Sequence, residues 1–253
     1  MIDIHSHILP GVDDGASSWV IAVEMVVAAA KDGIRHIVAT PHSNAQFRYD
    51  RSAFADRLLE LRKRVNVPIE LSLGCDFNFS LDNVQAALDD WRQFCIGSGP
   101  YLLVEFSDYG IPPNADTTLR RLIRCGVRPI ITHPERNPFL RSKPDMLYSM
   151  VGTGCLVQVT ANSITGFWGK EARRTCLGLL ARGLVSAVAT DAHDLTRRPP
   201  IMSAARDAIH SKFGKDIAEA LCSTIPNAIV EGKPIPDIPS LTRRREAGAG
   251  QVG

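Results

Sequence analysis

Residues 1–15 read MIDIHSHILPGVDDG, and the apolar start of this stretch predicts a short strand over 1–4. Two histidines, His5 and His7, come directly after that strand, where a purely apolar core has no use for them. In an extended chain, residues two apart point to the same side, so both imidazoles can bind one ion. The stretch therefore combines a buried strand with a candidate metal-binding pair.

The same alternation of short apolar runs and helical patterns continues along the chain. Strands are predicted at 1–4, 36–39, 69–73, 102–106, 129–132, 156–160 and 186–190. Helices are predicted at 17–31, 52–65, 82–90, 117–125, 145–151 and 167–182, and the segment from the last strand to about 232 is expected to be mostly helical. Seven strands alternating with helices indicate parallel βαβ units, and strands this short and apolar are typically buried on both faces. We therefore expect an α/β fold.

Length and composition agree with one folded domain. The chain has 253 residues, 45% of them apolar and 22% charged, which excludes a disordered or coiled-coil chain. A single α/β barrel of about 250 residues fits this length. Since no linker interrupts the chain, we expect one domain over 1–241, followed by a frayed tail over 242–253 that is rich in arginine, glycine and alanine.

Several classes of protein are disfavoured by the sequence. No apolar run reaches the roughly 18 residues that would span a bilayer. The first residues lack the basic and apolar regions of a signal peptide, so we expect a cytoplasmic protein with its six cysteines reduced. A net charge of +2 is too small to argue for nucleic-acid binding.

Polar residues gather at the ends of six of the seven predicted strands. They are His5, His7, His42, Asp76, Glu105, His133, Asp191 and His193. In an α/β barrel the carboxyl ends of the strands form one rim, where active sites lie. Mixed imidazole and carboxylate ligands suit Zn²⁺, Mn²⁺ or Fe²⁺ rather than Mg²⁺ or Ca²⁺. The number of ligands exceeds what one ion needs, so two or three ions are expected.

Taken singly, each of these residues also fits a simpler structural role. A lone His-x-His pair is often incidental, and Asp13 and Asp14 before Gly15 are also typical of a turn. His36 and His210 occupy no strand-end position, so we expect them to have no role in the site. Coincidence at six strand ends is hard to explain by turns or helix caps, which favours the metal site.

Arginines follow two of the candidate ligands closely. Arg136 lies three residues after His133, and Arg197 and Arg198 lie within five residues of His193. Arginine next to a metal cluster indicates an anionic substrate, phosphate above all. Phosphoester hydrolysis is the reaction that this combination serves best, because divalent ions acidify water and neutralise charge on phosphoryl oxygens.

These motifs resemble those of the polymerase and histidinol phosphatase (PHP) superfamily. The opening MIDIHSHILPGVDDG is similar to that of the manganese-dependent protein-tyrosine phosphatases of bacterial capsule and exopolysaccharide loci. Thr40-Pro41-His42, Leu103-Val104-Glu105-Phe106, His133-Pro134-Glu135-Arg136 and Asp191-Ala192-His193 follow in the same order, as does Arg198-Pro199-Pro200. The resemblance covers residues 1 to about 200.

The resemblance implies a distorted (β/α)₇ barrel of the PHP type with three divalent ions, most simply Mn²⁺, with Zn²⁺, Fe²⁺ or Co²⁺ as alternatives. The first ion would take His5, His7, Asp76 and Asp191, and the second would share Asp76 and add Glu105 and His133. The third would take His42, His193 and one of Asp13 and Asp14, for which we choose Asp14. Arg136 and Arg198 would bind the phosphate. In the family a glutamate usually occupies the position of Asp76, so the bridging arm is one methylene shorter here.

The resemblance also implies an activity and a partner. The expected enzyme hydrolyses phosphotyrosine in proteins, and its substrate would be a bacterial tyrosine autokinase that controls polysaccharide export. One alternative is a PHP phosphatase of a small metabolite such as histidinol phosphate. A second is a metal-binding regulatory module with little turnover, which the short Asp76 arm suggests. A metal amidohydrolase is less favoured, because it offers no role for the two arginines.

One motif points to a different chemistry. Cys176 and Arg182 match the Cys-x₅-Arg pattern of cysteine-dependent phosphatases. The residues between them are apolar helix formers, and the helical spacing of 167–182 puts Trp168, Ala172 and Cys176 on one face. A thiol in apolar surroundings has a raised pKa and is inert, so we expect Cys176 to be structural.

Overall fold

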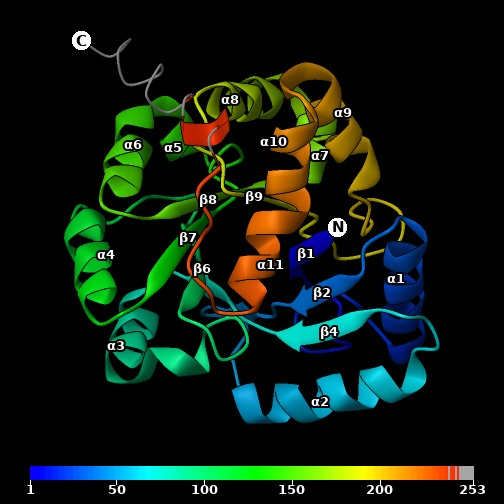
Figure 1. The fold of residues 1–253 in the computed structure, drawn as a ribbon. Coiled ribbons are helices and arrows are strands. Elements are labelled where there is room, and N and C mark those ends of the chain that lie inside the picture. Colours follow the sequence, from blue (N-terminus) through cyan, green and yellow to red (C-terminus); the bar gives the residue numbers. More distant parts are fainter. Residues whose placement is uncertain (239, 243, 245–253) are drawn as a thin grey trace.

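The computed structural model describes residues 1–238, 240–242 and 244 (Figure 1). Parallel strands lie at the centre of the molecule, and helices surround them. One hydrophobic cluster extends from Met1 to Leu241, which matches the alternation of strands and helices expected from the sequence. The predicted tail over 242–253 lies outside the described residues except for Thr242 and Arg244.

The strands form two parallel sheets. The smaller sheet has the order β1 (Ile2–Ser6), β2 (His36–Ala39) and β4 (Glu70–Leu73). The larger has the order β3 (His42–Ser43), β5 (Asp76–Asn78), β6 (Tyr101–Glu105), β7 (Arg128–Thr132), β8 (Leu156–Thr160) and β9 (Ala187–Ala189). The seven predicted strands are therefore confirmed to within one residue at most ends, except that β1 runs two residues further than expected.

The two sheets meet along β1 and β9. Asp191 N donates to His5 O at 2.8 Å, and His7 N donates to Ala192 O at the same distance. On the other side the chain itself connects the sheets, because β2 leads into β3 and β4 leads into β5. This arrangement agrees with the distorted barrel that the resemblance implies.

The distortion lies where β2 and β4 are interrupted. Pro41, which has no N–H group, separates β2 from β3, and Gly74-Cys75 separates β4 from β5. Asp76 N donates to Pro41 O at 3.0 Å, so hydrogen bonding resumes after the break, and His42 then pairs in register with Asp76. The two short strands were not predicted, because two or three residues cannot display an alternating pattern.

Helices cover the outside of the strands (Figure 1). In chain order they are α1 (Trp19–Lys31), α2 (Arg51–Arg64), α3 (Leu81–Asp90), α4 (Ala115–Arg124), α5 (Pro138–Ser142), α6 (Pro144–Gly152), α7 (Ala161–Thr165) and α8 (Gly169–Ala181). Capping explains several of their first residues: Ser18 Oγ, for example, accepts from Ile21 N, so α1 begins at Trp19 and not at 17. None of the helices in the described part of the chain has the length and apolar content that a bilayer span requires.

The single helix predicted over 167–182 is wrong at its start. The chain turns at Gly166, which has a φ of 97°, and α8 begins only at Gly169. Trp168 therefore precedes the helix and does not share the core face with Cys176. The left-handed conformation at Gly166 is one that glycine adopts without strain, so it ends the preceding helix, α7.

The C-terminal helices close one end of the barrel. After α9 (Ser203–Phe213) the chain forms α10 (Lys215–Glu219), a π-helical turn η2 (Ala220–Thr224) and α11 (Ile225–Val230). Residues directly after α11 reach the start of β6, where Tyr101 donates its hydroxyl proton to Lys233 O at 2.6 Å. Because these segments lie at the amino ends of the strands, the carboxyl ends remain available for a site.

Candidate metal centre

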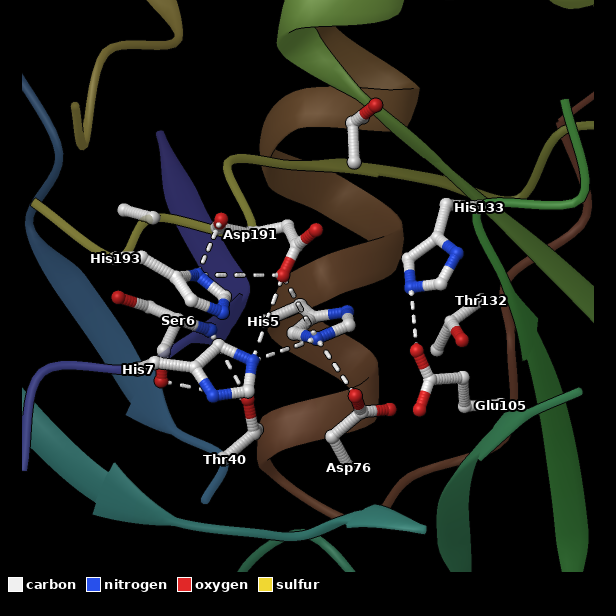
Figure 2. Close-up of polar contacts among 12 residues, drawn as sticks. His5, Ser6, His7, Thr40, Asp76, Glu105, Thr132, His133, Asp191 and His193 are labelled. Carbon is white, nitrogen blue, oxygen red and sulfur yellow. Dashed lines mark hydrogen bonds and ion pairs between the residues drawn. The ribbon is translucent and has the colours of Figure 1, made fainter. Parts of the chain in front are cut away.

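The eight ligands predicted at strand ends gather at the carboxyl ends of the strands, and all of them except His42 are labelled in Figure 2. They come from β1, β3, β5 and β6 and from the segments that follow β1, β7 and β9, and they are His5, His7, His42, Asp76, Glu105, His133, Asp191 and His193. The side chains of His5, His7 and Asp191 are buried, as is that of Asp76. These four ligands therefore belong to a buried cluster at the rim and are not solvated side chains.

The first group of donor atoms surrounds His5. Its Nε2 lies 3.3 Å from His7 Nε2, 3.6 Å from Asp76 Oδ2 and 3.4 Å from Asp191 Oδ1. His7 Nε2 is also 3.4 Å from Asp191 Oδ1. Donor atoms of His5, His7 and Asp76 lie close enough together to share one ion, as the His-x-His spacing predicts.

A second group forms around Asp14. Its Oδ1 lies 3.2 Å from His42 Nε2 and 3.5 Å from His193 Nε2. His7 completes the group of four residues whose donor atoms could hold one ion. Of the two adjacent aspartates, Asp14 is thus the one that faces these histidines, which supports our choice of Asp14 as a ligand.

A third group consists of His42, Asp76 and Glu105. His42 Nδ1 lies 3.0 Å from Asp76 Oδ2 and 3.9 Å from Glu105 Oε2. The resemblance assigned His133 to this position with Asp76 and Glu105. His133 Nε2 lies 3.6 Å from Glu105 Oε1. The residue whose donor atom lies close to both Asp76 and Glu105, however, is His42 and not His133.

Four buried polar atoms at this site make no hydrogen bond of good geometry among the described residues, although His42 Nδ1 and Asp76 Oδ2 lie within ion-pair distance of each other. The four atoms are both carboxylate oxygens of Asp76, Nδ1 of His42 and Nε2 of His193. A buried polar atom without a hydrogen bond is costly, and four at one site are explained if this site binds divalent ions. The donor chemistry and this set of unpaired atoms both fit divalent metals.

Three histidines are oriented by acceptors on their outer nitrogens. His5 Nδ1 lies 3.0 Å from Gln158 Oε1, and His7 Nδ1 lies 2.8 Å from Asp13 Oδ2. His193 Nδ1 lies 3.0 Å from the backbone carbonyl oxygen of Asp191. Since all three partners accept, each Nδ1 carries the proton and each Nε2 is left to face the centre. Gln158 was not predicted as part of the site; its one signal in the sequence is an amide inside an otherwise apolar strand.

Two ligand positions have a backbone that non-glycine residues rarely adopt. The φ angles are 31° at His133 and 53° at Asp191. Asp191 is therefore not extended, so the alternation that pairs His5 with His7 does not account for the pairing of Asp191 with His193. Glu135 holds the His133 loop in place, because its buried Oε1 accepts hydrogen bonds from Thr160 N and Oγ1, both at 2.9 Å. Such strain persists only where the surroundings enforce it.

The two predicted arginines meet at one carboxylate. Arg136 Nη1 and Arg198 Nη2 both bind Asp191 Oδ2, the latter at 2.6 Å. The opposite oxygen, Oδ1, faces His5 and His7. Arg197 is exposed and is not part of this contact. Asp191 thus joins the candidate metal ligands to the candidate phosphate-binding arginines.

Alternating charges determine the protonation of the site. Burial lowers the pKa of His5, but the carboxylates of Asp76 and Asp191 outweigh it and raise that pKa to about 9. Burial likewise lowers the pKa of His42, but its contacts with Asp14 and Asp76 outweigh burial and raise that pKa to about 11. Burial raises the pKa of Glu105 to about 7, with Asp76 adding to the effect. His5 and His42 are therefore cationic at neutral pH when protons are the only cations present.

Cys176 has none of the properties of a reactive thiol. It is fully buried within α8, and burial raises the pKa of its thiol well above the usual value. Arg182 follows the end of the same helix. The helical backbone amides cannot surround an anion, so the Cys-x₅-Arg match is structural, as predicted.

Comparison with known proteins agrees with these features. Residues 1–231 match the family described as capsular polysaccharide synthesis, CpsB/CapC. The tyrosine-protein phosphatase YwqE of Bacillus subtilis is 33% identical over 86% of this chain and 87% of its own. The tyrosine-protein phosphatase CpsB of Streptococcus pneumoniae is 29% identical over 91% and 98%.

Solved structures give the same result for the fold. A crystal structure from work on YwqE and CpsB, described there as metal-dependent tyrosine phosphatases, aligns with a TM-score of 0.87 at 32% identity. The alignment covers 93% of this chain and 96% of the other. An organophosphorus hydrolase variant aligns with a TM-score of 0.59 at 13% identity and indicates a shared barrel fold alone.

Proposed function

The chain belongs to the CpsB/CapC family, and from this premise we propose that it is a metal-dependent phosphatase acting on phosphotyrosine in proteins. The observation that carries the proposal is the position of Asp191. One of its oxygens faces the histidines and the other binds Arg136 and Arg198. A phosphate monoester needs both cations and hydrogen-bond donors, and this carboxylate holds the two sets side by side.

The arginines retain donors for a phosphoryl group. Asp191 takes one N–H from each guanidinium, which leaves four on each of Arg136 and Arg198. Nε of Arg198 is buried and has no partner among the described residues. We propose that these groups bind the non-bridging oxygens and hold phosphorus above the carboxylates.

Divalent ions bound by the histidines and carboxylates would supply an activated water and neutralise charge on the phosphoryl oxygens. The protein's part is to hold that cluster rigidly. Asp13 and Gln158 fix the rings of His7 and His5, and Glu135 fixes the loop that carries Arg136. A phenolate leaving group has a free pKa of about 10, so it departs with less help from a general acid than an alkoxide does.

Finer assignments are part of the same proposal. We propose Mn²⁺ as the working ion, with up to three ions per chain, and Zn²⁺, Fe²⁺ or Co²⁺ as substitutes. The ligands would be His5, His7, Asp14, His42, Asp76, Glu105, His133, Asp191 and His193. We also propose a cytoplasmic enzyme with one domain over 1–241, whose substrate is a bacterial tyrosine autokinase controlling capsule or exopolysaccharide synthesis.

The test is a substrate panel with metal-stripped and Mn²⁺-reconstituted protein. The panel holds a phosphotyrosine peptide, the same peptide with phosphoserine, and histidinol phosphate. We expect the highest kcat/KM with phosphotyrosine, and no turnover before reconstitution. A preference for histidinol phosphate would support the metabolite phosphatase, and bound metal without any hydrolysis would support the regulatory module.

A further inference from the structure

The side chain of Trp168 lies against both candidate phosphate-binding arginines. The Cζ atom of Arg136 is 4.2 Å from the centre of the indole, and that of Arg198 is 5.7 Å away. Trp168 stands in the turn between α7 and α8 and is partly buried, with Phe167 meeting its ring edge-on at 5.2 Å. Neither the metal ligands nor the proposed mechanism accounts for this aromatic side chain.

The two arginines pose an electrostatic problem. Both guanidinium groups bind the same oxygen of Asp191, so two positive charges lie close together around one negative charge. Their side chains are only 22% and 21% exposed, which limits the screening that water provides. An additional acceptor would stabilise the pair, but it would also occupy N–H groups that a phosphate needs.

An aromatic face resolves the conflict. The π-face of indole attracts a cation through its quadrupole without accepting the in-plane N–H hydrogen bonds of a guanidinium. Indole is the strongest of the three aromatic side chains in this respect. A tryptophan beneath both arginines can therefore hold their planes while their N–H groups stay directed at the phosphoryl oxygens.

We propose that Trp168 is a positioning residue for phosphate binding, acting through Arg136 and Arg198. The proposal rests on the proposed function in so far as the arginines bind phosphate. It concerns the affinity for the phosphoryl group, shared by substrate and transition state, so its loss raises KM more than it lowers kcat.

The experiment compares Trp168→Leu and Trp168→Phe in the Mn²⁺-loaded protein. The dissociation constant for inorganic phosphate is measured by calorimetry, and KM and kcat are measured with p-nitrophenyl phosphate. We expect Trp168→Leu to weaken phosphate binding by about tenfold and to raise KM similarly, with kcat and metal content nearly unchanged. Trp168→Phe, which keeps an aromatic face, should recover most of the loss.

The matched control is Trp91→Leu. Trp91 also has an arginine over its ring, Arg92 at 4.4 Å, but it lies beside Gly126 ahead of β7, at the amino ends of the strands. This variant loses a comparable contact and should keep wild-type phosphate affinity. Equal phosphate affinity in Trp168→Leu and wild type would overturn the proposal, as would equal losses in the leucine and phenylalanine variants.

A second measurement does not depend on the folding of the leucine variant. With Trp19 and Trp91 replaced by phenylalanine, Trp168 is the only indole left in the chain, and its emission should change as inorganic phosphate is added. Unchanged emission at saturating phosphate would contradict the proposal. Because phosphate binding is measured without turnover, an absence of phosphotyrosine hydrolysis would overturn the proposed function and leave this inference to be decided by the affinities.

Discussion

Asp13 Oδ2 lies 2.8 Å from His7 Nδ1, on the side of the imidazole that faces away from the cluster. The same oxygen lies 3.2 Å from His42 N, and the other carboxylate oxygen accepts from Gly15 N at 3.0 Å. Asp13 therefore orients a candidate ligand, whereas its neighbour Asp14 faces His42 and His193 directly. Two adjacent aspartates that look equivalent in the sequence have different roles in the structure.

This difference predicts different effects on metal binding. Asp13→Asn should weaken binding by about 10- to 100-fold, because an orienting partner of a metal-binding histidine is lost, while the number of bound ions at saturation stays the same. Asp14→Ala should lower that number by one. Metal content after dialysis and a competition titration against a chelating dye measure the two quantities. Identical behaviour of the two variants would show that the assignment is wrong.

The raised pKa values of His5 and His42 predict that metal binding releases protons. Their pKa values are raised to about 9 and about 11, so both rings hold a proton at neutral pH and must lose it to bind an ion. Apparent affinity should therefore rise with pH, and less steeply above about pH 9, where His5 no longer has a proton to release but His42 still does. Calorimetry at neutral pH in two buffers of different ionisation enthalpy gives the number of protons released. If metal binding released no protons, the prediction would be contradicted.

Asp76 offers a test of the shared carboxylate. Its buried side chain lies next to both His5 and His42 and forms part of two of the three candidate ion groups. Asp76→Glu lengthens the arm by one methylene and should be tolerated or improve turnover. Asp76→Asn keeps the shape but removes the charge, so both metal content and kcat should fall sharply. Full activity in Asp76→Asn would exclude Asp76 as a ligand.

The two arginines should be needed for substrate binding but not for metal binding. Arg136→Ala and Arg198→Ala should each raise KM or lower kcat so that kcat/KM falls by about 10- to 100-fold, the value of charge-assisted hydrogen bonds. Metal content should stay normal. Arg197→Ala is the matched control, since Arg197 adjoins Arg198 in sequence but is exposed. Wild-type kinetics in both test variants would remove the arginines from the phosphate site.

The fold could be predicted because the central strands are short segments in which apolar residues prevail. Leu156–Thr160 matches its predicted bounds, and the strand end at Glu105 lies within one residue of the prediction. The breaks at Pro41 and Gly74 could not be predicted, because they depend on how neighbouring strands pair across the sheet. The start of α8 was predicted two residues too early, because Phe167 and Trp168 fit the helical period of the residues that follow them.

The set of candidate ligands could also be found from the sequence, but not their grouping. A histidine or carboxylate after an apolar strand is visible locally, as at His133. The group of ligands to which His42 belongs depends on the register between β3 and β5, which pairs His42 with Asp76. This pairing joins residues far apart in the chain and is not visible in the local sequence. Trp168 was missed because its partners are arginines that lie 32 and 30 residues away in the chain, and a tryptophan beside helix formers is typical of a core residue.

Metal catalysis and cysteine catalysis predict opposite responses to one substitution and one chelator. Cys176 is buried in α8, and burial raises the pKa of its thiol, so a nucleophilic thiolate does not form there at neutral pH. Cys176→Ser should keep nearly full specific activity toward an aryl phosphate, although a buried hydroxyl without an assured partner should cost about 1–3 kcal/mol of stability and lower Tm. EDTA should abolish activity in both wild type and variant, and Mn²⁺ should restore it in both. If folded Cys176→Ser were inactive and wild-type activity survived the chelator, metal-dependent catalysis would be overturned in this protein, because the reaction would then depend on the thiol and not on the metal.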